Sequence, residues 1–278
     1  MSFRHAICNE AFDKWDFAEA CRTMKRLGYQ GIEIAPFTLA EYPESISASR
    51  RKELADIIQS EGLEFAGLHW LMVSPAGLSV TTPDEILRAR SWQHIRSLID
   101  LCADLGPNGV MVFGSPKQRS STGGLTAAEA TRNYVDGLAG VAQQAESRGV
   151  TLLIEALPVE QTDVVLSLDE AVLHVQSIGS SAVQTMFDTH NAVNEIQPHA
   201  DLIEKHYRFI RHIHVNETDG RHPGTGDYDF VSIFKRLHKL NYQGWISMEA
   251  FDFAPGAERL ADESIKYLNC RIEEALSK

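Results

Sequence analysis

The sequence lacks paired cysteines, because its four cysteines are scattered and form no Cys-x-x-Cys motif. We therefore expect free thiols in a reducing cytoplasm and no disulfide framework. No apolar run is long enough to cross a membrane. The N-terminus also lacks the basic-then-apolar layout of a signal peptide. These absences predict a cytoplasmic protein with no membrane partner.

An excess of positive charge is absent as well. The chain has 26 Lys and Arg against 38 Asp and Glu, which gives a formal net charge of -12. Proteins that bind a nucleic-acid backbone usually carry a basic face, so we expect no nucleic-acid partner. Hydrophobic residues make up 44% of the 278 residues, which is enough for a full core. Because no linker or low-complexity segment interrupts the chain, we assign residues 1–278 to one domain.

Short apolar or β-branched runs alternate with longer amphipathic stretches along the whole chain. The predicted strands are 3–8, 31–35, 63–68, 109–113, 150–155, 183–188, 210–215 and 245–249. The predicted helices are 16–27, 47–60, 83–105, 126–148, 167–178, 198–207, 229–240 and 255–276. Eight strands and eight helices in strict alternation predict an α/β fold, a single closed (β/α)8 TIM barrel.

Each of the last four predicted strands ends in a residue that can bind a divalent cation. These residues are Glu155, Asp188, His214 and Glu249. In a barrel of parallel strands, the C-terminal ends of the strands form the catalytic face. One such carboxylate is more simply a strand-end cap or an ion-pair partner, but three buried carboxylates in register would be costly without a cation. The set predicts one divalent metal ion, Mn²⁺ first, with Mg²⁺ or Co²⁺ as the alternatives. These oxygen-rich donors suit such ions better than a structural Zn²⁺ site, which would use more sulfur or imidazole.

The segments around these four residues resemble the xylose isomerase-like TIM barrel superfamily, in its branch of sugar phosphate isomerases and ketose 3-epimerases. The matching segments are 153–155, 186–189, 212–215 and 247–249, together with the loop 223–227. The resemblance implies that Glu155 and Glu249 are both metal ligands and the acid/base pair. They would transfer a proton through a metal-stabilised enediolate of a carbohydrate substrate. The resemblance also implies a homo-oligomer.

The sequence departs from ketose 3-epimerases at three positions that contact the sugar in that family. Gln161 stands where a glutamate is usual, Asn191 where a histidine is usual, and Gly220 where an arginine is usual. The residues that would hold the metal are therefore kept, while those that would grip the sugar differ.

Candidate substrate-binding residues lie near other strand ends. They are His69, Lys117, His190 and Arg221. Lys117 and Arg119, among hydroxyls and glycine, could hold a phosphate or carboxylate, or could equally belong to a solvated loop with surface ion pairs. His69 could bond a sugar hydroxyl beside a stacking Trp70, or be a buried histidine bonded to the backbone. Glu33 is expected to be a hydrogen-bond partner in the barrel mouth.

The predicted function is that of a divalent-metal-dependent sugar isomerase or epimerase. Its substrate would be a small keto or aldose sugar, or a sugar acid or phosphate. The same site could instead decarboxylate a 3-oxo sugar acid or act as a lyase on a keto-glycoside. A nuclease of the AP-endonuclease branch would need several more histidines and metal ions. A non-catalytic sugar-binding barrel would not need two apposed glutamates.

Overall fold

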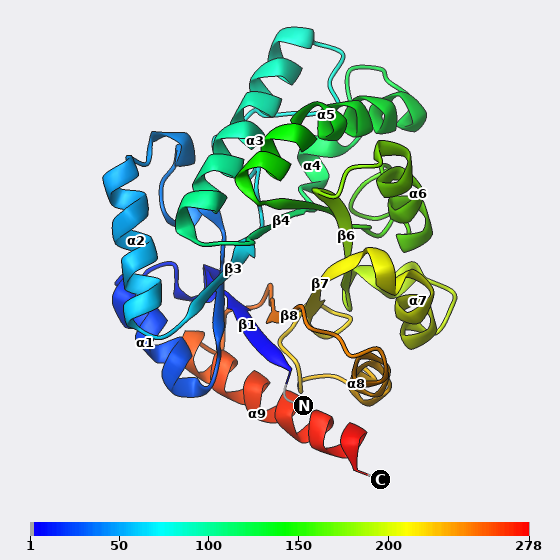
Figure 1. Ribbon diagram of the computed structural model, residues 1–278. Coiled ribbons are helices and arrows are strands. Elements are labelled where there is room, and N and C mark those ends of the chain that lie inside the picture. Colours follow the sequence, from blue (N-terminus) through cyan, green and yellow to red (C-terminus); the bar gives the residue numbers. More distant parts are fainter. Residues whose placement is uncertain (1–2, 278) are drawn as a thin grey trace.

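Eight parallel strands form a closed barrel and follow one another around it in sequence order, as the computed structural model in Figure 1 shows. The strands are β1 (Arg4–Cys8), β2 (Gly31–Ile34), β3 (Glu64–Leu68), β4 (Val110–Phe113), β5 (Thr151–Ile154), β6 (Val183–Asp188), β7 (Ile210–Val215) and β8 (Trp245–Met248). Pairing of β1 with β8 closes the ring. The structure describes residues 3–277, so the first two residues of the N-terminus considered above lie outside it. The predicted barrel is confirmed.

Eight long helices surround the barrel, each within two residues of its predicted bounds (Figure 1). They are α1 (Phe17–Leu27), α2 (Ala48–Ser60), α3 (Glu85–Leu105), α5 (Ala127–Arg148), α6 (Leu168–Ile178), α7 (His199–His206), α8 (Phe230–Lys239) and α9 (Ala257–Leu276). Within residues 3–277, short 3-10 turns and one further turn of α-helix, α4 (Pro116–Arg119), lie between these elements, and α4 falls in a segment for which the sequence pattern predicts a loop. The turn changes the position of its basic side chains, as described below.

Side-chain caps fix where several helices begin. Thr126 accepts a hydrogen bond from the amide of Glu129, and the Glu129 carboxylate accepts one from the amide of Thr126. This reciprocal pair satisfies two amides that α5 itself cannot bond. Asp16 and Ser47 cap α1 and α2 in the simpler way, by accepting one amide hydrogen bond each. Because the helix starts are fixed, the preceding loops are held over the C-terminal ends of the strands.

The interior of the barrel is apolar toward the N-terminal ends of the strands and polar toward their C-terminal ends. At the N-terminal ends, Trp245 packs with Ala6 and Ala66. A side chain at Gly31 would lie only 2.8 Å from the indole of Trp245, so this large ring needs the glycine opposite it. At the other end, Glu33 and the side chains of the last strands replace this apolar filling. Polar chemistry is thereby confined to one mouth of the barrel.

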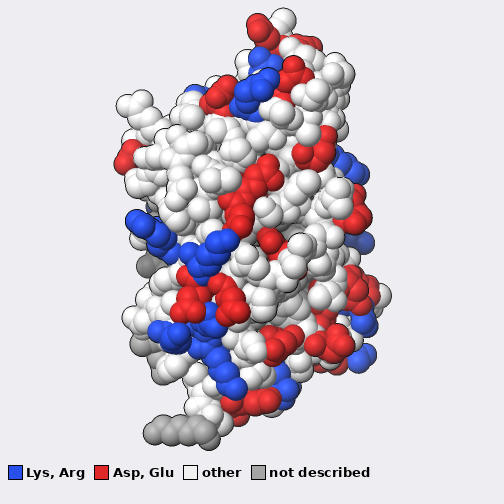
Figure 2. Space-filling view, turned by 90° about the vertical axis from the view of Figure 1, so that its right-hand side faces the viewer, with Lys and Arg blue, Asp and Glu red and all other residues white. Residues whose placement is uncertain are grey.

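The surface and the cysteines agree with the composition. On the face shown in Figure 2, basic and acidic side chains lie side by side. Ion pairs between neighbouring helices, such as that of Arg236 on α8 with Asp201 on α7, account for such mixing. This mixture differs from the basic face of a nucleic-acid binder. All four cysteines are free, as predicted. Within residues 3–277, none of the helices has the length and apolar character needed to span a bilayer.

Candidate active site

The four predicted metal ligands meet at the C-terminal mouth of the barrel. Glu155 and Glu249 directly follow β5 and β8, while Asp188 and His214 lie in β6 and β7 as register partners. All four are buried. Ligand atoms of Glu155, Asp188 and His214 lie within 4.8 Å of one another, and Oε2 of Glu249 lies 3.1 Å from Nδ1 of His214. The structure thus brings together all four residues that the strand ends pointed to.

Two buried atoms in this group, Nδ1 of His214 and Oδ2 of Asp188, make no hydrogen bond of acceptable geometry within residues 3–277. Nδ1 of His214 nevertheless lies within ion-pair distance of two carboxylates, 3.5 Å from Oδ2 of Asp188 and 3.1 Å from Oε2 of Glu249. Buried polar atoms are nearly always bonded in folded proteins, so such a pair indicates a missing ligand. Three carboxylates and one imidazole suit a hard divalent cation. The residues present therefore fit a metal ion.

A buried carboxylate beneath the site fixes the orientation of His214. Glu33, on β2, is fully buried and accepts a hydrogen bond from Nε2 of His214 at 3.1 Å. It accepts another from Nε2 of His212 at 2.8 Å. This confirms the expectation that Glu33 is a hydrogen-bond partner. With Nε2 engaged in this way, Nδ1 of His214 is the nitrogen directed at the ligand group, an arrangement common for metal-binding histidines.

Burial and charge shift the pKa values of these groups strongly. Burial, together with the nearby carboxylates of Asp188 and Glu249, raises the pKa of Glu155 to about 8. Burial lowers the pKa of His214, but Glu33 and Glu249 outweigh burial and hold the pKa well above its usual value. The site therefore concentrates negative charge, which a bound cation would neutralise.

Each of the two glutamates is held by a neutral hydrogen-bond donor. The indole N–H of Trp70 donates to Oε1 of Glu249 at 2.9 Å. The amide of Asn191 donates to Oε1 of Glu155 at 2.9 Å and accepts from Gln161 at 3.1 Å. The sequence comparison treated Asn191 and Gln161 as losses of sugar-binding residues. In the structure they form a chain of amides that orients a glutamate.

Both glutamates line one open cavity with a volume of about 210 Å³. Trp70, His190 and Phe251 form an aromatic wall on one side, with the rings of His190 and Phe251 5.2 Å apart. Gln161, Asn191 and His69 contribute further polar side chains to its lining. Two of the predicted substrate-binding residues, His69 and His190, therefore face the cavity, and their contact with substrate stays a prediction.

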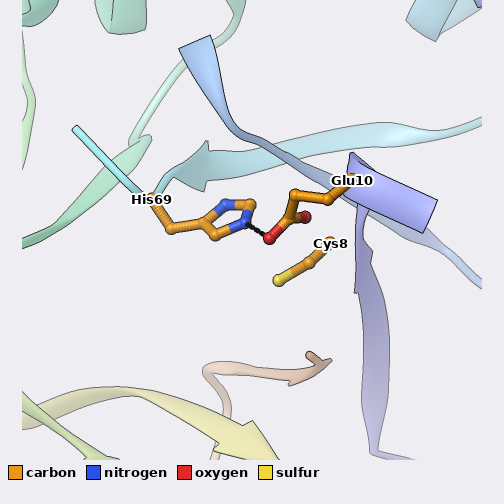
Figure 3. Close-up of side chains that lie close together, drawn as sticks. All are labelled: Cys8, Glu10 and His69. Carbon is orange, nitrogen blue, oxygen red and sulfur yellow. Dashed lines mark ion pairs between the residues drawn. The ribbon is translucent and has the colours of Figure 1, made fainter. Parts of the chain in front are cut away.

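His69 belongs to a buried cluster with Cys8 and Glu10, drawn in Figure 3. Its Nε2 lies 2.6 Å from Oε1 of Glu10, which follows β1, and the Cys8 side chain lies next to the pair. Burial lowers the pKa of His69, but Cys8 and Glu10 outweigh burial and raise the pKa well above its usual value. The His69 side chain is thus paired with the Glu10 carboxylate and is not held by the backbone alone. No pattern in the sequence links β1 to β3 in this way.

The predicted cationic residues do not reach the cavity. Lys117 is exposed on α4, and the exposed Arg221 pairs with Asp219 at 2.7 Å. Neither lines the cavity. Arg119 is fully buried and donates to the backbone carbonyls of Phe113 at 2.9 Å and Glu155 at 2.7 Å. The interpretation of Arg119 as a ligand for an anionic substrate is therefore wrong, because its guanidinium is occupied inside the protein.

Comparison with known proteins gives a consistent result. The sequence profile of the family described as "Xylose isomerase-like TIM barrel" matches residues 21–270. A D-psicose 3-epimerase of Agrobacterium fabrum is 26% identical over 241 residues, which cover 84% of this chain and 79% of that protein. A 3-dehydro-D-guloside 4-epimerase of Escherichia coli is 23% identical over 252 residues, covering 87% and 89%. The crystal structure of a 3-keto-D-glucoside 4-epimerase from E. coli, in its apo form, matches the fold with a TM-score of 0.83 at 20% identity, covering 97% of this chain and 100% of that one.

Proposed function

The chain belongs to the xylose isomerase-like TIM barrel family, and on that premise we propose that it is a divalent-metal-dependent sugar epimerase or isomerase. The relatives named above are epimerases of sugars or keto-glycosides. The observation that carries the proposal is that Glu155 and Glu249 line one cavity while Asp188 and His214 lie directly beside them. Carboxylates so placed suit proton transfer at a carbon next to a carbonyl group.

In this reaction, the side chains of this protein would bind the metal ion, transfer the proton and position the two glutamates. When bound by Glu155, Asp188, His214 and Glu249, a divalent cation, with Mn²⁺ the first candidate, supplies a Lewis acid that increases the acidity of the hydrogen next to the carbonyl. One glutamate removes that proton and leaves an enediolate. The other glutamate returns a proton, on the opposite face for epimerisation or at the neighbouring carbon for isomerisation. Trp70 and Asn191 hold the two carboxylates in position during both steps.

The alternatives that require an anionic substrate find less support. Among residues 3–277, no Lys or Arg lines the cavity. Decarboxylation of a sugar acid and cleavage of a nucleic-acid backbone would each bring a negative group toward Glu155 and Glu249 with no cationic side chain to pair with it. A lyase reaction on an uncharged keto-glycoside remains compatible with the cavity, and analysis of the products distinguishes it.

Solvent exchange at carbon tests the proposal. The protein is incubated with Mn²⁺ and a panel of ketoses and keto-glycosides in D₂O, and the products are followed by NMR. We expect deuterium to enter next to the carbonyl, with a new sugar isomer formed. Glu155→Gln and Glu249→Gln should each slow exchange by roughly 10²–10⁴-fold. Glu160→Gln, at an exposed acid in the loop after β5, serves as the matched control.

Two results would contradict the proposal. The first is exchange that proceeds undiminished in both glutamine variants while their melting temperatures match that of the wild type. The second is product formation by loss of carbon dioxide or of a leaving group, with no isomer detected.

A further inference from the structure

Trp70 and Phe251 extend from the cavity to the outside of the protein. Both line the cavity, yet their side chains are 38% and 40% exposed. Their rings lie edge to face with centroids 6.1 Å apart. An aromatic surface that is continuous from the reacting carboxylates to the solvent can contact a part of the substrate that lies outside the cavity.

The backbone holds both rings in place. Trp70 has a φ of +51°, a conformation that bulky residues rarely adopt. Its indole is also tied to Glu249 by the hydrogen bond described above. Such backbone strain persists only where surrounding structure enforces it, and it often occurs at functional sites. The position of the indole is therefore fixed independently of any ligand.

Gly220 provides the space for Phe251. The amide of Phe251 donates to the carbonyl of Gly220 at 2.8 Å, so the two backbones are adjacent. Gly220 has a φ of +79°, and a Cβ there would lie 2.6 Å from Cδ2 of the Phe251 ring. Any other residue would both strain the backbone and displace the ring. The loop after β7 is thus built to place an aromatic ring at the cavity mouth.

The charge of the cavity is unsuited to an anionic substrate. Its carboxylates are Glu155 and Glu249, and its amides, Gln161 and Asn191, are neutral. His69 is paired with Glu10, so this ion pair adds no net positive charge. As described above, the cations near the mouth are either exposed outside the cavity or occupied beneath it. A phosphate or carboxylate on the part of the substrate away from the proposed metal ion would therefore be desolvated without a cationic side chain to compensate.

We propose that the substrate is an uncharged sugar that carries an apolar substituent, such as an aromatic or alkyl glycoside. The sugar ring lies at Glu155 and Glu249, and the substituent lies against Trp70 and Phe251. A cavity of about 210 Å³ is smaller than the roughly 300–1,000 Å³ typical of ligand pockets. It encloses one sugar ring and leaves the substituent at the mouth. This inference rests on the proposed function and specifies the class of sugar.

Binding of stable, unreactive glycosides tests the inference separately from turnover. The probes are phenyl and methyl glycosides of D-glucose, D-galactose and D-mannose, together with D-glucose 6-phosphate, each titrated against the Mn²⁺-loaded protein by calorimetry or NMR. We expect the phenyl member of at least one pair to bind about fivefold more tightly than the methyl member, because an aromatic group gains edge or face contacts with Trp70 and Phe251. Glucose 6-phosphate should bind no more tightly than methyl glucoside.

Three variants identify the surface responsible. Phe251→Ala should reduce the preference for the phenyl member to less than twofold. Gly220→Ala should have the same effect through displacement of the ring, while leaving Phe251 itself present. Phe253→Ala, at a neighbouring exposed phenylalanine that does not line the cavity, should keep the preference. Melting temperatures verify that each variant is folded.

The outcomes separate this inference from the proposed function. Equal binding of phenyl and methyl glycosides, or tighter binding of the phosphate, would overturn the inference, and the proposed function would stand if deuterium exchange still occurred. Absence of both glycoside binding and exchange would overturn both. Retention of the phenyl preference in Phe251→Ala and Gly220→Ala would overturn the assigned surface.

Discussion

The indole of Trp70 donates a hydrogen bond to Glu249 at 2.9 Å, although 179 residues separate the two in the chain. Asn191 holds Glu155 in the same way at 2.9 Å. A glutamate side chain has three rotatable bonds, so a fixed donor restricts where its free oxygen points. The proton transfer that we propose for these two glutamates would require this positioning.

Replacement of the Trp70 indole by a phenyl ring should reveal the contribution of this hydrogen bond. Trp70→Phe keeps an aromatic ring at the cavity wall but removes the N–H donor. Hydrogen bonds to charged groups contribute about 1.5–3 kcal/mol, so we expect kcat to fall about tenfold or more while KM changes little. Steady-state kinetics on the sugar identified by deuterium exchange measures both constants.

Trp15→Phe, at a tryptophan outside the cavity, is the control and should leave both constants unchanged. An unchanged kcat in Trp70→Phe would show that the hydrogen bond does not position Glu249 for catalysis. A rise in KM with no change in kcat would instead assign Trp70 to substrate binding alone.

Arg119 and Lys117 should respond differently to substitution although both lie on α4. Arg119→Met removes the buried donor to the carbonyls of Phe113 and Glu155, of which only the Phe113 carbonyl keeps a second side-chain donor, the Tyr134 hydroxyl, so we expect a loss of about 3 kcal/mol in unfolding free energy. Lys117→Met removes an exposed side chain and should change the unfolding free energy by less than about 0.5 kcal/mol. Denaturant unfolding measures both. A substrate-binding role for Arg119 would show instead as a higher KM with unchanged stability.

The strand ends of the site could be predicted from the sequence because the signal there is local. Each of the last four strands is a short apolar run with a candidate ligand residue at or next to its C-terminal end, so Glu155, Asp188, His214 and Glu249 needed only the barrel geometry to meet. Their burial and mutual distances bear this arrangement out.

The surroundings of the ligands could not be predicted because they depend on contacts between distant segments. The segment with Lys117 and Arg119 has the composition of a solvated loop, yet one turn of helix carries the Arg119 guanidinium inward to carbonyls of β4 and β5. The pair of His69 with Glu10 joins two non-adjacent strands. Gly220 appeared only as a missing arginine, and its contact with Phe251 requires the folded backbone.

The ion pair of His69 and Glu10 gives a prediction about the pKa of a histidine that lines the cavity. Glu10→Gln removes the negative charge that helps to raise the pKa of His69, although burial continues to lower it. The pKa of His69 should therefore fall toward or below its usual value. NMR titration of the His69 ring in selectively labelled protein measures this, with Glu41→Gln, at an exposed acid, as control. An unshifted His69 titration in Glu10→Gln would contradict the prediction.

Glu33→Gln should weaken metal binding although Glu33 is not itself a ligand in the proposed set. The carboxylate accepts from Nε2 of His214 and thereby directs Nδ1 toward the site. Loss of such a supporting partner typically lowers metal affinity 10–100-fold. Titration with Mn²⁺, followed by electron paramagnetic resonance, should give one site per chain in the wild type and this weaker affinity in the variant. Mn²⁺ should also raise the melting temperature of the wild type by more than that of Glu33→Gln.

The control for this experiment is Glu64→Gln, which changes an acid at the opposite end of the barrel, where Glu64 pairs with Arg4 at the surface. Its Mn²⁺ affinity should equal that of the wild type. Affinity in Glu33→Gln as high as in the wild type would show that His214 is oriented without Glu33. Absence of Mn²⁺ binding by the wild type would contradict the metal site itself.

His5 should make the stability of the protein depend on pH below neutrality. It is buried outside the polar mouth of the barrel, and burial lowers its pKa from 6.5 to about 4. Between these values the unfolded chain binds a proton that the folded chain does not, so this contribution to stability is complete above about pH 6.5 and is lost as the pH falls through about 4. At 1.36 kcal/mol per pKa unit, the loss reaches about 3 kcal/mol.

Urea unfolding across this pH range measures the effect. The acid-induced loss of unfolding free energy in His5→Gln should be smaller than in the wild type by about 3 kcal/mol. His238→Gln, at an exposed histidine, should follow the wild type. An identical pH dependence in wild type and His5→Gln would mean that His5 is protonated in the folded protein as readily as in the unfolded chain.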